Sequence, residues 1–202
     1  MNTEFHDITA FEFFEAFKKI FSDPNLLPLF KDAWKDRTRF TELVMPKISQ
    51  ILSAKKYSTQ CEYFKIDVIG WSDRKGEPDY INIKQPSNNA LNTHFWHLGV
   101  AVEHENDHKD WTYELVKLLY INCPLRVVIG YYPEDLSDDD LASTIKYASR
   151  IVSLANKNRS LIRNDQQYLL ILGRNHKDPE KLGVDTYSAY CYNTKRRKFI
   201  KQ

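Results

Sequence analysis

The chain has 202 residues, of which 42% are hydrophobic and 13% aromatic, and its formal net charge is +2. This composition predicts a packed globular protein, because disordered chains have fewer apolar residues or a higher net charge. A chain of this length is typical of one domain, so we expect a single domain over residues 1–202.

The first part of the chain, residues 1–57, is expected to be helical. Apolar residues recur at helical spacing from Ile8 to Phe21, and Ser22-Asp23-Pro24 ends the pattern. A second apolar stripe runs from Phe40 to Leu52, where Pro46 is expected to kink the helix or to begin its later part. The aromatic residues of these stripes are interpreted as core.

Residues 58–132 have the texture of alternating strands and helices. Glu62–Trp71 is rich in β-branched and aromatic residues and is predicted to be one strand, followed by a loop over 72–93 around a short strand at 80–83. Phe95–Glu105 is apolar on both faces in its interior, which predicts a central strand covered on both sides. A helix capped by Asp107 or Asp110 then runs up to Pro124, and Leu125–Tyr132 is a further buried strand.

Residues 133–202 are predicted to hold one helix and two strands. Ser137 and Asp140 have the spacing of a capping box and open the helix. The strands are expected at Tyr168–Leu172 and Thr186–Tyr192. The fold class is therefore α/β, with a central mixed sheet flanked by helices and preceded by an N-terminal helical segment.

Composition also bears on location and partners. The three cysteines form no CxxC pair, the N-terminus carries acidic residues instead of a basic signal-peptide region, and no uncharged apolar run is long enough for a membrane span. We therefore expect a cytoplasmic protein without membrane contact and with reduced thiols.

The charges are distributed unevenly along the chain. Residues 61–150 hold 15 acidic and 9 basic side chains, whereas residues 151–202 hold 4 acidic and 11 basic side chains. This asymmetry fits a metal site beside a nucleic-acid surface, and it fits solvated faces equally well. Self-association leaves no signature in the sequence, so a homo-oligomer is neither predicted nor excluded.

The clearest chemical signal lies at the end of the predicted central strand. Glu103 and Glu105 point to the same face because strand side chains alternate, and His104 points away. Two carboxylates ending an apolar strand need neutralisation, which Mg²⁺ or Mn²⁺ provides through oxygen ligands. Asp67, in the preceding long strand, is a candidate third ligand. The competing interpretation is two exposed glutamates that pair with lysines.

This arrangement resembles the PD-(D/E)xK nuclease superfamily, which has the restriction endonuclease-like fold. The resemblance covers about residues 60–132: Asp67 in one strand, Glu103-x-Glu105 ending the next 36 residues later, then a helix and a buried strand. It implies a metal-dependent nuclease in which Asp67, Glu103 and Glu105 bind Mg²⁺ or Mn²⁺ and activate water. Glu105 stands where that family usually has a lysine, so Lys117 on the following helix is the candidate for the amine, with Glu114 supporting it.

Two alternatives remain open. A chain without the usual lysine also fits a degenerate member of the same fold that binds nucleic acid or protein without cutting. His104-Glu105-x-x-His108 matches the H-E-x-x-H motif of zinc hydrolases, but that motif must lie within a helix, whereas a strand end is predicted here.

A basic segment near the C-terminus, Lys195-Arg196-Arg197-Lys198, is a candidate for gripping nucleic-acid phosphates. A frayed, solvated terminus fits the same residues.

Overall fold

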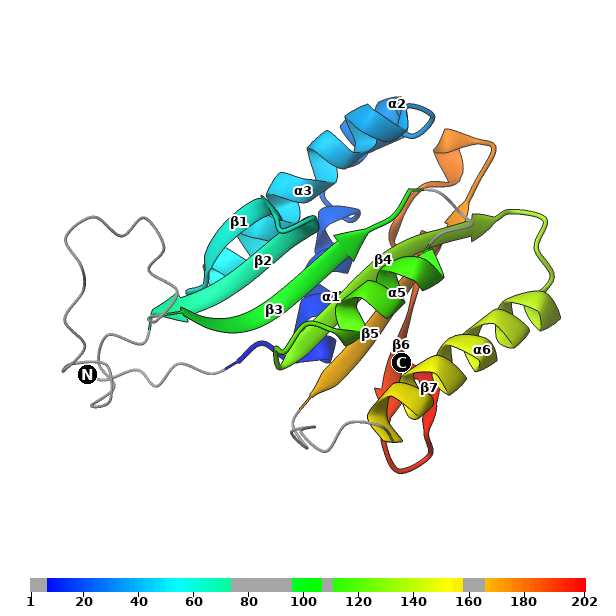
Figure 1. Ribbon diagram of the computed structural model, residues 1–202. Helices are drawn as coiled ribbons and strands as arrows, with labels where there is room; N and C mark the ends of the chain where they lie inside the picture. The colour runs from blue at the N-terminus through cyan, green and yellow to red at the C-terminus, as the bar shows by residue number, and fades with distance from the viewer. Residues whose placement is uncertain (1–6, 74–95, 107–110, 158–165) are drawn as a thin grey trace.

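A seven-stranded mixed sheet runs through the centre of the computed structural model, which describes residues 7–73, 96–106, 111–157 and 166–202 (Figure 1). The strands lie in the sheet in chain order. Their bounds are β1 (Ser58–Tyr63), β2 (Ile66–Asp73), β3 (Trp96–His104), β4 (Leu125–Pro133), β5 (Gln167–Asn175), β6 (Tyr187–Asn193) and β7 (Lys198–Lys201). The helices are α1 (Ala10–Ile20), α2 (Leu27–Ala33), α3 (Arg37–Ala54), α5 (Trp111–Leu119) and α6 (Asp138–Lys157), with short 3₁₀ turns at Pro179–Lys181 and Val184–Thr186. The predicted α/β class with a mixed sheet and an N-terminal helical segment is confirmed.

The strand directions decide which residues meet at each edge of the sheet. β1, β2 and β3 form an antiparallel meander, β3, β4 and β5 are parallel, and β6 and β7 return antiparallel. Val102 in β3 pairs with Val68 in β2 and with Val127 in β4. The carboxyl ends of β3, β4 and β5 therefore lie at the same edge as the beginning of β2.

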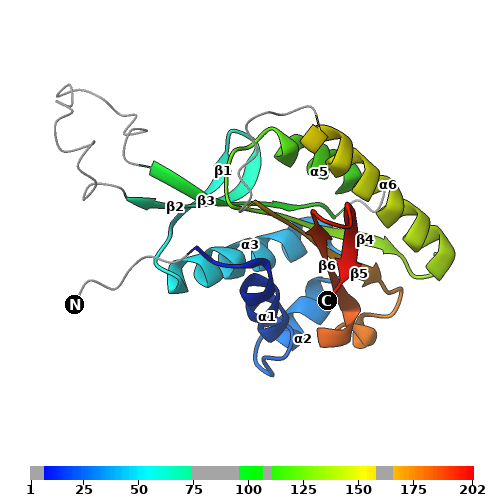
Figure 2. The ribbon, with the colours of Figure 1, turned by 90° about the horizontal axis from the view of Figure 1, so that it is seen from below.

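Helices cover both faces of the sheet, as Figure 2 shows in an edge-on view, where α1, α2 and α3 lie on one side and α5 and α6 on the other. Two apolar cores result. The first joins α1–α3 to residues such as Val100, Val102 and Ile129, and the second joins α5 and α6 to residues such as Ala101 and Val128. Because consecutive β3 residues belong to opposite cores, the strand is buried on both faces, as its uninterrupted apolar interior predicted.

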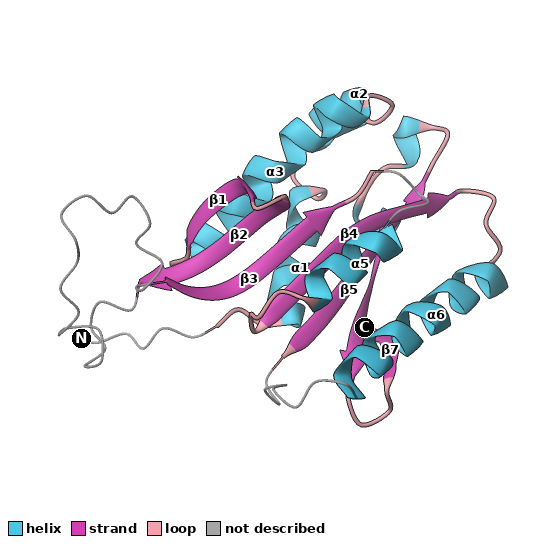
Figure 3. Ribbon diagram, in the orientation of Figure 1, coloured by secondary structure: helices cyan, strands magenta, loops and turns pink. Residues whose placement is uncertain are grey.

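Local signals account for most element boundaries (Figure 3). Thr9 and Glu12 form a capping box that begins α1, and Asp36 caps α3 through the backbone N–H of Arg39. Ser137 accepts from the backbone N–H of Asp140 at 3.1 Å at the start of α6, as its spacing predicted. Pro46 lies inside α3, which continues on both sides of it. None of the helices in the described ranges combines the length and the apolar character needed to cross a membrane.

Two predictions about the ends of the sheet need correction, one for Glu62–Trp71 and one for the C-terminus. Glu62–Trp71, predicted as one strand, is the end of β1, a two-residue turn at Phe64 and Lys65, and most of β2. The turn has no Gly, Asn or Asp, so no ordinary turn residue marked it. The C-terminus is not frayed, because β7 pairs with β6 and buries Phe199, but Lys195–Lys198 are exposed to solvent, as the alternative interpretation expected. The short strand at 80–83 and the caps at Asp107 and Asp110 lie outside the described residues.

Candidate functional site

The alternation of side chains along β3 sends Glu103 and His104 to opposite faces. Ala101 lies in the core beneath α5 and α6, so Glu103, two residues later, faces α5. His104 faces the other way, where its Nε2 lies 3.0 Å from the hydroxyl of Tyr131 and its ring stacks near Phe40. The prediction that these neighbours point apart is confirmed.

Lys117 is the centre of a polar cluster on the α5 side of this edge. Its Nζ lies 2.9 Å from Glu103 Oε1 and 2.5 Å from Glu114 Oε2, one helical turn earlier on α5. The same Nζ donates a 2.8 Å hydrogen bond to the backbone carbonyl of Lys65, in the turn between β1 and β2. Three elements thus place their polar groups around one ammonium.

Asp67 belongs to the same cluster. Its Oδ2 accepts a 2.7 Å hydrogen bond from the backbone N–H of His104, which fixes the carboxylate at the end of β3. Asp67 interacts electrostatically with Glu103 and Lys117. Val68 pairs with Val102 in the antiparallel register of β2 and β3, so Asp67 is the β2 residue that lies opposite Glu103. The structure therefore brings together Asp67, Glu103, Lys117 and Glu114, four of the five residues that the sequence pointed to here.

Burial makes this cluster electrostatically unusual. Glu103 is only 1% exposed, and burial, with the nearby Asp67 charge adding to it, raises its pKa to about 8 although Lys117 opposes the shift. Burial likewise raises the pKa of Asp67. For Lys117, burial by itself lowers the pKa, but the carboxylates of Glu114 and Glu103 outweigh it and hold the pKa above its ordinary value. Three acidic side chains, Asp67, Glu103 and Glu114, thus surround one ammonium, and a divalent cation that binds there would displace the proton that Glu103 keeps up to about pH 8.

The oxygen atoms present fit a hard divalent cation. Glu103 Oε1 and Glu114 Oε2 are buried, and although Lys117 is close to both, neither accepts a well-aligned hydrogen bond within the described part of the chain. Mg²⁺ is commonly held by one or two carboxylates, with water and substrate phosphate completing its shell. Asp67 and Glu103 supply such a pair. Within the described ranges, no group of three or more His, Cys, Asp or Glu side chains is arranged around one point as a metal site.

Glu105 and the side chain of His104 lie outside this polar cluster. Glu105 follows β3 and is half-buried, and its backbone N–H donates to the Ile129 carbonyl at 2.8 Å. Its carboxylate does not complete a group of three with Asp67 and Glu103, so the predicted three-carboxylate site is not formed by these described residues. His108 lies outside the described residues. His104 lies in a strand with its Nε2 directed at Tyr131, and burial lowers its pKa to about 4. The helical geometry that an H-E-x-x-H zinc site requires is therefore not formed at His104.

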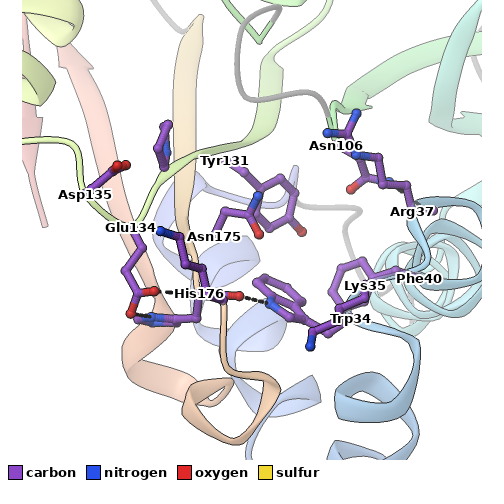
Figure 4. Close-up of a pocket in the computed structure, with 12 residues that line it drawn as sticks. Trp34, Lys35, Arg37, Phe40, Asn106, Tyr131, Glu134, Asp135, Asn175 and His176 are labelled. Atoms are coloured by element: carbon purple, nitrogen blue, oxygen red, sulfur yellow. Dashed lines mark hydrogen bonds and ion pairs between the residues drawn. The ribbon is translucent and has the colours of Figure 1, made fainter.

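A pocket that the sequence did not indicate lies at the same sheet edge, on the face covered by α1–α3. It has a volume of about 460 Å³, and Figure 4 shows aromatic side chains from Trp34, Phe40 and Tyr131 within it. Trp34 Nε1 donates to the backbone carbonyl of His176 at 2.8 Å, which ties the α2–α3 connection to the end of β5. Its residues lie far apart in the sequence, so no local motif could have revealed it.

Ion pairs organise one wall of this pocket around Glu134. Its carboxylate lies 2.7 Å from Lys181 Nζ and 3.2 Å from His176 Nδ1, and it accepts from the backbone N–H of Lys177 at 3.0 Å. The Lys181 contact and these hydrogen bonds lower the pKa of Glu134 to about 2. These contacts give Glu134 a structural role at the end of β4.

The basic segment Lys195–Lys198 is exposed and comprises the end of the turn between β6 and β7 and the first residue of β7. Because β6 runs antiparallel to β5, and β5 runs parallel to β3 through β4, this turn lies at the edge where β3 begins. It is therefore at the opposite end of the sheet from Glu103. Binding of nucleic acid by these four residues stays a prediction, but they do not adjoin the carboxylate cluster.

Comparison of the chain with protein-family models, with curated proteins and with solved structures found no match. The functional argument therefore depends on the residues of the site.

Proposed function

We propose that this protein is a metal-dependent phosphodiesterase of the PD-(D/E)xK type that acts on nucleic acid. Its sheet would then have the restriction endonuclease-like arrangement. The observation that carries the proposal is the convergence of Asp67, Glu103 and Lys117 at one sheet edge, although the first two are 36 residues apart in the chain and the third comes from a helix. The resemblance named the same three residues in the same element order of two strands followed by a helix.

Each side chain has a distinct part in the proposed reaction. Asp67 and Glu103 would hold Mg²⁺ or Mn²⁺, and a divalent ion bound there lowers the pKa of water and polarises a phosphoryl oxygen. The pKa of Lys117 is raised, so its ammonium is charged at neutral pH and can donate a hydrogen bond to the phosphate oxygen on which negative charge develops. Glu114 and the Lys65 carbonyl hold the ammonium in place through the 2.5 Å and 2.8 Å contacts.

A second candidate is a degenerate member of the fold that binds nucleic acid or protein without cutting. The observation that favours it is the ion pair between Lys117 and Glu103, which already neutralises the buried carboxylate without a metal. In that case the cluster is a structural network, and Mg²⁺ does not compete with the ammonium.

The deciding experiment is a cleavage assay on single- and double-stranded DNA and RNA with Mg²⁺ and with Mn²⁺. We expect weak cleavage that Glu103→Ala abolishes, because this change removes a ligand of the ion. Lys117→Ala should lower the rate about a hundredfold, the typical effect of losing one electrostatic contact to the transition state. Lys146→Ala, which removes an exposed lysine of α6, is the matched control and should cut like the wild type.

Two outcomes would contradict the proposal. Wild-type protein that cuts no substrate with either metal favours the degenerate binding module. Cleavage that survives Glu103→Ala unchanged identifies a contaminating nuclease and removes the assignment of this site.

A further inference from the structure

The turn between β1 and β2 has residues that do not suit its backbone. Tyr63 pairs with Ile66, so Phe64 and Lys65 are the two central residues, with φ values of 48° and 62°. Positive φ at both positions is the signature of a type I′ turn, which strongly favours Asn-Gly. Neither apolar core requires a phenylalanine there, because Phe64 is 80% exposed and belongs to neither of them.

The turn that carries Phe64 nevertheless adjoins the candidate site. The next residue, Lys65, accepts the hydrogen bond from Lys117 Nζ, and Asp67 follows two residues later. Tyr63 packs against the core beneath α5 and α6 and meets the Phe64 ring edge-on, with 4.6 Å between the ring centroids and an interplanar angle of 88°. The face of an aromatic ring is thus presented to solvent within a few residues of the cluster.

We infer that Phe64 stacks on an exposed base of the substrate, next to the phosphodiester bound at Asp67, Glu103 and Lys117, and that the substrate is therefore single-stranded nucleic acid. This inference rests on the proposed function and specifies its substrate class. A base stacked on an aromatic side chain contributes to affinity without sequence preference, because every base has a π-face. In an intact duplex both faces of each base are covered by neighbouring base pairs, so an aromatic ring on a turn finds no face to contact.

The turn's unfavourable backbone is consistent with this role. Local rules of turn chemistry are broken most often where a side chain serves a site instead of the fold. Lys65 adds a positive charge at the same exposed turn. Cations beside an aromatic platform are the usual combination in surfaces that bind single strands.

The test compares Phe64→Asn and Phe64→Trp with the wild type. Asn tolerates the left-handed conformation, so the first variant removes the ring and keeps the turn, whereas Trp keeps an aromatic face. Phe11→Asn is the matched control, because Phe11 is also a strongly exposed phenylalanine, 63% exposed, but lies on α1 on the other face of the sheet. Circular dichroism verifies that each variant is folded.

Two measurements use short single-stranded and duplex oligonucleotides of DNA and of RNA, with Ca²⁺ in place of Mg²⁺. Fluorescence anisotropy gives the affinity, and 2-aminopurine placed in the strand reports stacking as a loss of its fluorescence. We expect Phe64→Asn to weaken single-strand binding about tenfold and to abolish the 2-aminopurine signal. Phe64→Trp should restore both, and Phe11→Asn should behave as the wild type.

The outcomes separate this inference from the proposed function. Single-strand affinity and 2-aminopurine fluorescence that Phe64→Asn leaves unchanged would overturn the stacking role, and the cleavage assay would still decide the function. Equal weakening for single strands and duplexes would also overturn it, because a stacking platform discriminates between them. A wild-type protein that neither binds nor cuts any of the oligonucleotides overturns both. Altered self-association of Phe64→Asn in gel filtration, with unchanged binding, would identify Phe64 as a protein contact instead.

Discussion

Replacing Glu103 by Gln should change how the stability of the protein depends on pH. Glu103 is 1% exposed and its pKa rises from 4.5 to about 8 on folding. Between these two values the folded chain keeps a proton that the unfolded chain has lost, so raising the pH favours unfolding. The stability associated with this group is complete below pH 4.5 and is lost as the pH rises through about 8. Glutamine is isosteric and does not titrate, so the variant lacks this loss.

The size of the effect follows from the pKa difference. One proton contributes a slope of about 1.4 kcal/mol per pH unit, so the loss over the whole window is on the order of 5 kcal/mol if Glu103 titrates alone. This is a large fraction of the total stability of an ordinary domain. The assay is urea unfolding in EDTA from pH 5 to pH 9, followed by the fluorescence of the buried Trp34 and Trp111. The free-energy difference between Glu103→Gln and the wild type should grow with pH in favour of the variant.

Magnesium turns the same pair of proteins into a test of metal binding. A ligand that binds only the folded state stabilises it by about 2.7 kcal/mol at a concentration one hundred times its dissociation constant. We expect Mg²⁺ to stabilise the wild type at pH 8 and to have little effect on Glu103→Gln. Glu42→Gln, at an exposed position of α3, is the control and should follow the wild type. Parallel pH profiles for wild type and Glu103→Gln would refute the electrostatic argument, and an equal response to Mg²⁺ would refute Glu103 as a ligand.

Three further predictions concern stability. His104 is buried with its pKa lowered to about 4, so its contribution to the free energy of unfolding is complete above pH 6.5 and is lost as the pH falls toward 4. In urea unfolding, His104→Gln should remove about 3 kcal/mol of this acid sensitivity, and a loss that persists in the variant would belong to other groups. Arg126 is 2% exposed, and its Nε donates to the carbonyls of Leu118 at 3.0 Å and Ile121 at 2.8 Å. Arg126→Met should leave these carbonyls at the end of α5 without a hydrogen bond and lower the free energy of unfolding by about 3 kcal/mol. An unchanged midpoint in urea would show that water replaces these bonds. Phe64→Gly should raise the midpoint of thermal unfolding, because glycine removes about 1 kcal/mol of backbone strain at this left-handed position. A lower midpoint would mean that the contact between the Phe64 and Tyr63 rings outweighs the strain.

The sequence by itself determined several of the helices and strands and the two faces of β3. Helical and strand periodicity depend only on residues close in the chain, so α1, α3, α5, α6, β3 and β4 follow from local pattern. The same alternation placed Glu103 and His104 on opposite faces, and the three-residue spacing of Glu114 and Lys117 placed both on one side of α5. Those relations survive any arrangement of the remaining elements.

Only the tertiary structure decided which distant groups meet. The antiparallel register of β2 and β3 brings Asp67 beside Glu103, and the packing of α5 against the sheet brings Lys117 between Glu103 and the Lys65 carbonyl. The turn at Phe64 was not visible, because Phe-Lys carries none of the residues that tolerate positive φ. The sheet directions likewise separated the basic segment Lys195–Lys198 from the carboxylates, since only the pairing of β6 with β5 fixes the edge at which that turn lies. Local sequence sets the conformation of each element, whereas long-range pairing sets which ends of the elements share an edge.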